Sequence, residues 1–85
     1  MESNFVITWI LPSLMTDDDF DFLEKEKASK TPEMAYRFKI FDDDGILYIE
    51  GLSAENNSFE PLDEFGINYG CTEIHYFENG KFQRL

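Results

Sequence analysis

Residues 34–52 read MAYRFKIFDDDGILYIEGL, and this stretch predicts the centre of the fold. From Met34 to Phe41, side chains of two kinds alternate along the chain, which is the period-two pattern of a β-strand with two different faces. An Asp-rich turn follows at 42–45, and residues 46–52 return as a second strand. We therefore expect an antiparallel hairpin here.

The loop of this hairpin is expected to hold an even number of residues. A two-residue loop at 44–45 pairs Lys39 with Glu50, and a four-residue loop pairs Arg37 with Glu50. Either loop sets Glu50 opposite a cation, whereas a three-residue loop would set it opposite Phe38. The two even loops both remain open.

The N-terminal segment predicts a strand and then a helix. Residues 4–11 are rich in β-branched and aromatic side chains, stop at a proline, and carry apolar groups on both faces, so we expect a strand inside the sheet. The helix is expected over 17–28, capped by Thr16 with Asp19 three residues on. We expect it to bury Phe20 and Leu23.

The C-terminal half predicts a helical turn and a second hairpin. Residues 59–66 read as one short turn that begins near a proline and ends at a glycine. Asn79-Gly80 is the preferred pair for a type I′ turn, and it would place Glu78 against Lys81 and Phe77 against Phe82 in the register of that hairpin. The last strand is expected over 81–85.

These elements predict an α+β fold. The order is strand, helix, strand, strand, short helix, strand, strand, with about five strands in a mainly antiparallel sheet and one helix packed on one face. We expect residues 1–85 to form a single small acidic domain, because a chain of this length supports one modest core.

The charge of the chain limits what it binds. The 18 Asp and Glu residues outnumber the 7 Lys and Arg residues, for a net charge of −11. Such a surface repels the phosphate backbone, so we expect no direct nucleic-acid binding. No apolar run approaches the length that spans a bilayer, and no signal peptide is expected, so we predict no membrane association and a cytoplasmic location.

Neither a metal centre nor an active site is expected. Neither Asp cluster fits an EF-hand loop, although a weak cation site at 42–44 remains an alternative to a solvated turn. Cys71, Glu73 and His75 share one strand face if the period of two holds, but no second Cys or His completes a zinc site. We expect a buried Cys71, a half-exposed His75, no cofactor and no catalysis.

Acidic side chains that the local structure does not explain concentrate between the two hairpins. We predict a binding surface there, and Tyr48, Tyr69 and Tyr76 are the tyrosines expected to be exposed. The predicted binding residues are Glu55, Glu60, Asp63, Glu64, Tyr69 and Glu73.

Three stretches carry a resemblance: residues 36–51, 59–63 and 70–74. With these motifs, residues 36–85 resemble a group of short, uncharacterised bacterial and phage proteins. The resemblance implies a bacterial setting and no particular activity.

The sequence leaves three classes of function. The first is a non-catalytic interaction or regulatory module that presents acidic surface to a basic protein, in its sharper form an inhibitor that mimics nucleic acid. The second is a protein that binds a cation, or catalyses a reaction, through Cys71, Glu73, His75 or the Asp turn. The third is a small domain whose acidity serves solubility alone. We favour the first.

Overall fold

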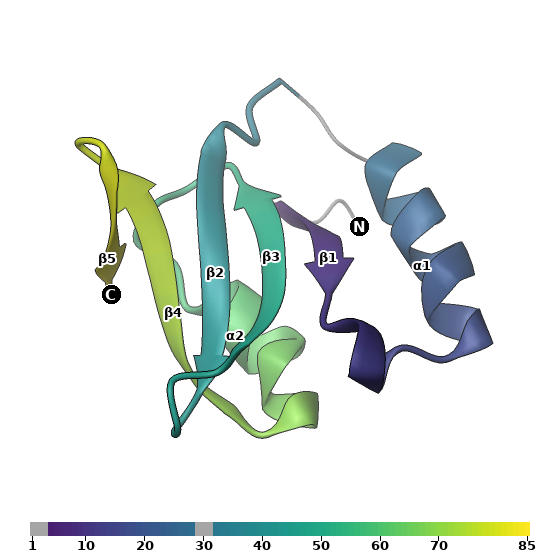
Figure 1. The fold of residues 1–85 in the computed structure, drawn as a ribbon. Helices are drawn as coiled ribbons and strands as arrows, with labels where there is room; N and C mark the ends of the chain where they lie inside the picture. The colour runs from purple at the N-terminus through teal and green to yellow at the C-terminus, as the bar shows by residue number, and fades with distance from the viewer. Residues whose placement is uncertain (1–3, 29–31) are drawn as a thin grey trace.

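The computed structural model describes residues 4–28 and 32–85. Its sheet has five strands in the order β1-β3-β2-β4-β5, and every neighbouring pair is antiparallel (Figure 1). The α+β fold and the order of its elements are confirmed. The elements are β1 (Phe5–Ile10), the 3-10 turn η1 (Pro12–Leu14), α1 (Asp17–Ala28), β2 (Tyr36–Asp42), β3 (Leu47–Ser53), α2 (Glu60–Glu64), the 3-10 turn η2 (Gly66–Tyr69), β4 (Cys71–Glu78) and β5 (Lys81–Arg84).

The first strand lies at an edge of the sheet, so its predicted place inside the sheet is wrong. Helix α1 runs beside its outer edge (Figure 1). The carboxylate of Glu26 accepts a hydrogen bond from the backbone N–H of Ile7. The helix therefore covers the edge that a further strand would otherwise cover, which explains why β1 carries apolar groups like an inner strand.

Helix α1 has the predicted bounds, but it docks through a different phenylalanine. The Asp19 carboxylate accepts a hydrogen bond from the Thr16 N–H, as in a capping box. Phe20 is 60% exposed, so its predicted burial is wrong. Phe22 instead stacks on Phe65 with 5.3 Å between ring centroids, and Leu23 packs against the core but is only partly buried, where burial was expected.

The central hairpin has the pairing of Lys39 with Glu50, but not an even loop. The N–H of Asp42 donates to the carbonyl of Ile46, which leaves the three residues 43–45 in the loop, and Gly45 has φ of 79°. The register shifts at Tyr48, which is an extra residue, or bulge, on its strand. This shift brings Lys39 opposite Glu50, the pairing that an even loop would have given. One irregularity therefore compensates for the other.

The C-terminal hairpin is as predicted. Asn79 and Gly80 both have positive φ, at 52° and 84°, which is the type I′ geometry. Its strands pair Glu78 with Lys81 and Phe77 with Phe82.

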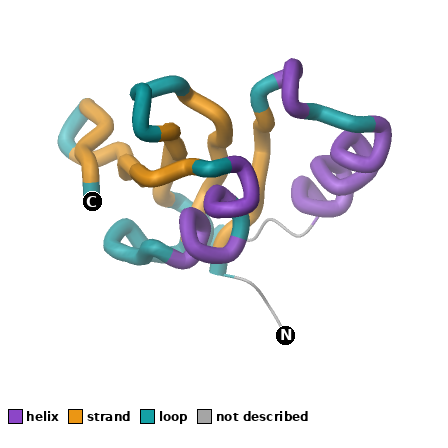
Figure 2. The backbone as a smooth tube through the Cα atoms, turned by 90° about the horizontal axis from the view of Figure 1, so that it is seen from below, coloured by secondary structure: helices purple, strands orange, loops and turns teal. Residues whose placement is uncertain are grey.

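The core lies between the sheet and the helical segment that follows β3. Segments α2 and η2 cover one side of the strands, and α1 stands beside β1 (Figure 2). Gly51 sits where the sheet is tightest, because a Cβ there would lie 2.3 Å from the Val6 carbonyl oxygen and 2.4 Å from the Phe38 ring. The buried core residues are Phe5, Ile7, Ile10, Phe38, Ile40, Ile49, Leu62, Cys71, Ile74 and Tyr76.

None of the described helices is long and apolar enough to cross a membrane.

Candidate interaction surfaces

The acids of α2 point away from the core on one stripe of the helical segment. Pro61 and Leu62 are buried. The exposed side chains are spaced three or four positions apart along the segment, and they are Glu60, Asp63, Glu64 and Ile67. Two large apolar side chains stand at the ends of this stripe, Phe59 at 48% exposure and Ile67 at 63%. We call the residues Phe59, Glu60, Asp63, Glu64 and Ile67 the α2 surface.

Glu55 and Tyr69 flank the α2 surface. Glu55 is exposed in the turn after β3, where its N–H donates to the Ser53 hydroxyl. Tyr69 is half-buried, with its ring 5.5 Å from that of Phe65. Burial raises the pKa of the Tyr69 hydroxyl, and the charge of Asp19 on α1 adds to the effect. The start of α1 therefore contributes negative potential beside η2.

Tyr76 is buried, so its predicted exposure is wrong. Its hydroxyl donates to the carbonyl oxygen of Ser58 at 2.6 Å and ties the loop before α2 to β4. Burial is the main reason that the pKa of this hydroxyl is raised, and the charges of Glu55 and Glu60 also raise it. The exposed tyrosine is Tyr36, at 40%.

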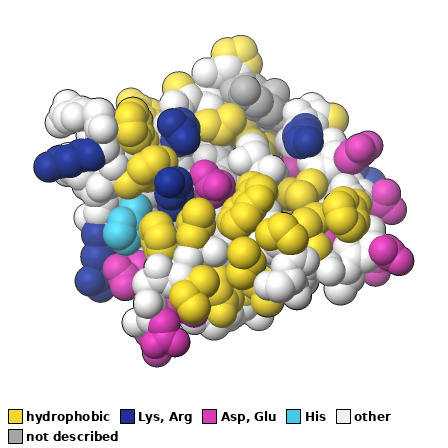
Figure 3. All heavy atoms as spheres, viewed as in Figure 1, with side chains coloured by type: hydrophobic (Ala, Val, Ile, Leu, Met, Phe, Trp, Pro, Cys, Tyr) yellow, Lys and Arg dark blue, Asp and Glu magenta, His cyan; other side chains and the backbone are white. Residues whose placement is uncertain are grey.

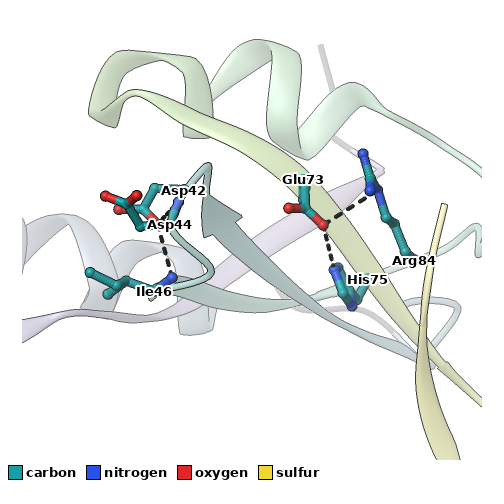
Figure 4. A network of polar contacts seen from close by, with 6 residues as sticks. All are labelled: Asp42, Asp44, Ile46, Glu73, His75 and Arg84. Carbon is teal, nitrogen blue, oxygen red and sulfur yellow. Dashed lines mark hydrogen bonds and ion pairs between the residues drawn. The ribbon is translucent and has the colours of Figure 1, made fainter.

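Glu73 does not join the other predicted binding residues. Its Oε1 lies 3.3 Å from Nε2 of His75 and 3.3 Å from Nε of Arg84 (Figure 4). These three side chains project from β4 and β5 on the sheet face opposite the core. The carboxylate is therefore paired within the chain.

Cys71 and His75 lie on opposite faces of β4, because the period of two fails between them. The pairings of Asp42 with Cys71 and of Phe41 with Glu73 leave Thr72 as an extra residue, a bulge. Cys71 is therefore buried in the core, and burial raises the pKa of its thiol to about 11, with the charge of Asp42 adding to the effect. The predicted buried Cys71 and half-exposed His75 are confirmed.

The second face of the sheet brings together basic and aromatic groups that lie far apart in the sequence. Lys39, His75 and Arg84 are neighbours across β2, β4 and β5. Arg37 Cζ lies 5.4 Å from the ring centroids of both Phe77 and Phe82, and Lys39 Nζ lies 4.3 Å from that of Phe82. The basic–aromatic face consists of Arg37, Lys39, His75, Phe77, Phe82 and Arg84.

Figure 3 shows this side of the molecule, with hydrophobic side chains across its middle and the imidazole and several cationic side chains towards β4 and β5. The alternation of Arg37 and Lys39 with apolar residues was the signal for it in the sequence. The pairing of β2 with β4 was needed to bring these cations to Phe77 and Phe82.

Asp42 shapes the backbone of the 42–45 turn, while Asp43 and Asp44 are exposed. Asp42 Oδ1 accepts hydrogen bonds from the N–H groups of Asp44 and Ile46, at 3.0 and 2.8 Å (Figure 4). The Tyr48 hydroxyl also bonds to Asp42, which is the largest of the effects that raise the pKa of Tyr48. Carboxylate oxygens of Asp42, Asp43 and Asp44 lie within 4.8 Å of one another. This arrangement is explained by the turn itself.

Comparison of the chain with protein-family models, with curated proteins and with solved structures finds no match.

Proposed function

We propose that this protein is a non-catalytic interaction module and that its α2 surface binds a basic protein. The observation that carries the proposal is the exposure of Phe59 and Ile67 beside three exposed carboxylates, Glu60, Asp63 and Glu64. Apolar side chains that stand clear of the core supply contact area, and the surrounding carboxylates select a cationic partner.

The charge distribution supports this assignment. No Lys or Arg stands between Lys39 and Lys81 in the sequence, so the segment that carries α2 supplies acids and no Lys or Arg of its own. Asp19 adds its field at Tyr69, the last residue of η2. A potential of one sign over a small area speeds association with a basic protein and makes the rate fall with salt.

The non-catalytic part of the proposal rests on the position of the thiol. A nucleophilic cysteine needs a base within hydrogen-bond reach and a lowered pKa. Cys71 has a raised pKa, and His75 lies on the other face of its strand, paired with Glu73. A buried, unreactive thiol also fits the reducing bacterial cytoplasm in which we place the protein.

Photocrosslinking tests the proposal. A photoreactive phenylalanine analogue replaces Ile67, and the captured proteins are compared between the wild-type surface and the triple variant E60Q/D63N/E64Q. We expect a basic protein whose capture falls in the triple variant and at raised salt. The matched control is D21N/D43N/D44N, which removes the same number of exposed carboxylates elsewhere and should leave capture unchanged.

Two results would count against the proposal. One is a captured protein that is not basic, and the other is an equal loss of capture in the two triple variants, since that would assign the effect to net charge alone. A captured protein whose own ligand is DNA or RNA would identify the module as a mimic of nucleic acid.

A further inference from the structure

Among the described residues, one edge of the sheet is covered by a helix and the other edge is uncovered. Helix α1 covers the outer edge of β1, where the Glu26 carboxylate occupies the backbone N–H of Ile7. At the other end of the sheet, no element of residues 4–28 or 32–85 lies beyond β5 (Figure 1). The free edge is therefore the outer side of Lys81–Arg84.

The hydrogen-bond pattern shows which backbone groups this edge offers. The N–H of Leu85 donates inward, to the carbonyl of Ile74 on β4. Inward and outward residues alternate along an antiparallel strand, so Lys81 and Gln83 also bond inward. The N–H and C=O groups of Phe82 and Arg84 then point outward, to the free edge. A strand added there has two donors and two acceptors to pair with.

The side chains of this edge favour an acidic strand. Strand β5 carries Lys81 and Arg84 and no acid. Arg84 is 67% exposed; its Nε is 3.3 Å from Glu73 Oε1, and the guanidinium has other N–H groups for a second carboxylate. Strand β5 of a second copy would bring no carboxylate of its own to Lys81 or Arg84, so it complements the charge of this edge less well than an acidic strand does.

We propose that the β5 edge binds an extended acidic segment of a partner protein by strand addition. An antiparallel segment places one carboxylate opposite Lys81 and one opposite Arg84, three residues apart, with an apolar side chain opposite Phe82. That apolar side chain extends the row formed by Phe77 and Phe82, whose rings lie 5.1 Å apart. The site is separate from the α2 surface. Its partner is acidic, whereas the partner proposed for the α2 surface is basic.

A peptide titration tests the proposal. The probe is the capped peptide Thr-Glu-Thr-Val-Glu-Thr, and the control replaces both Glu residues by Lys. We expect the acidic probe to shift the amide resonances of Phe82 and Arg84 in a saturable way, and the basic control not to. Arg84→Gln should weaken binding by up to about fivefold, the worth of one cross-strand charge pair. Lys27→Gln on α1, the matched neutralisation, should not.

A backbone variant separates strand addition from simple charge attraction. Residues 71–85 can be made synthetically and joined to residues 1–70 at Cys71, with an N-methyl group on Phe82. Because the N–H of Phe82 points outward, the β4–β5 hairpin keeps its bonds and the thermal midpoint should be unchanged. Binding of the acidic probe should fall at least about tenfold, the loss expected when a backbone hydrogen bond is replaced by a steric block.

Three outcomes overturn the proposal. In the first, the acidic probe fails to shift Phe82 and Arg84, or shifts them no more than the basic control does. In the second, the N-methylated protein folds and binds the probe as well as the unmodified protein. In the third, a short oligothymidine or a second copy of the chain occupies the edge instead, as read from the same resonances and from sedimentation.

Discussion

The Oε1 of Glu26 on α1 lies 3.3 Å from the backbone nitrogen of Ile7 on β1, as the acceptor of its hydrogen bond. Glu26 lies nineteen residues further along the chain, so this contact fixes how the helix sits against the sheet. The carboxylate is partly removed from water, and this desolvation raises its pKa, while the bond from Ile7 acts in the opposite direction. One side chain thereby covers the edge of the sheet and titrates abnormally.

Glu26 should make the stability of the fold depend on pH. Its pKa in the folded chain is raised above the ordinary value of 4.5, so the folded state holds this proton more tightly than the unfolded state. The stabilisation that Glu26 contributes is complete at pH values below its ordinary pKa. It is lost as the pH rises through the raised pKa of the folded state. Glu26→Gln keeps an acceptor for Ile7 without the titration. In urea unfolding from about pH 4 to about pH 7, the free energy of unfolding of the variant should therefore increase relative to that of the wild type as the pH rises.

Glu24→Gln is the control for this experiment, because Glu24 is an exposed acid of the same helix. Its unfolding curve should change with pH as that of the wild type does. Parallel curves for the wild type and Glu26→Gln would contradict the assignment.

Gly51 should tolerate no side chain. A Cβ would overlap the Val6 carbonyl oxygen and the Phe38 ring at the centre of the sheet. We expect Gly51→Ala to cost about 3 kcal/mol of unfolding free energy or more. Gly45→Ala is the matched change, since it has open space and only the strain of φ at 79°, worth about 1 kcal/mol. Chemical denaturation of both variants measures the difference, and equal losses would contradict the packing.

The C-terminal hairpin was predictable because its turn is local chemistry, whereas the expected even loop of the central hairpin was wrong. Asn79-Gly80 accepts positive φ at both positions, and that alone fixes the pairing of Phe77 with Phe82. The bulges were not predictable, since nothing in the sequence at Tyr48 or Thr72 marks an extra residue. The bulge at Thr72 sends Cys71 to the core and Glu73 to the other face, which a strict period of two could not show.

Phe22 should anchor α1, and Phe20 should not. Phe22 stacks on Phe65, whereas Phe20 is 60% exposed. We expect Phe22→Ala to cost about 2 kcal/mol and to loosen the helix, because it removes a partly buried ring contact. Phe20→Ala should stay within about 0.5 kcal/mol of the wild type. Thermal unfolding followed by far-UV circular dichroism measures both, and a larger loss for Phe20→Ala would show that the helix docks by its other side.

Asp42 should act as a turn former. Asp42→Ala removes the acceptor of two backbone N–H groups and of the Tyr48 hydroxyl, at an expected cost of about 1–3 kcal/mol. Asp43→Ala, at an exposed position of the same turn, should change stability by less than about 0.5 kcal/mol. Denaturation with and without Ca²⁺ measures both effects. A cost of Asp42→Ala that appears only with Ca²⁺ would instead assign the turn to a cation.

The candidate surfaces were predictable in part. Glu60, Asp63 and Glu64 follow from one helical turn whose proline and leucine face the core. Glu73 could not be separated from them, because its pairing with Arg84 depends on the β4–β5 register and on the bulge before it. The basic–aromatic face also required strand order, since Arg37 and Phe77 are far apart in sequence and meet only through the pairing of β2 with β4.

Binding of basic partners by the α2 surface is best measured by a chemical-shift titration with a basic, partly apolar peptide. We expect saturable shifts concentrated at residues 59–69, abolished by E60Q/D63N/E64Q and retained in D21N/D43N/D44N. Shifts spread evenly over 17–21, 42–44 and 59–69, or unchanged in the first triple variant, would contradict it.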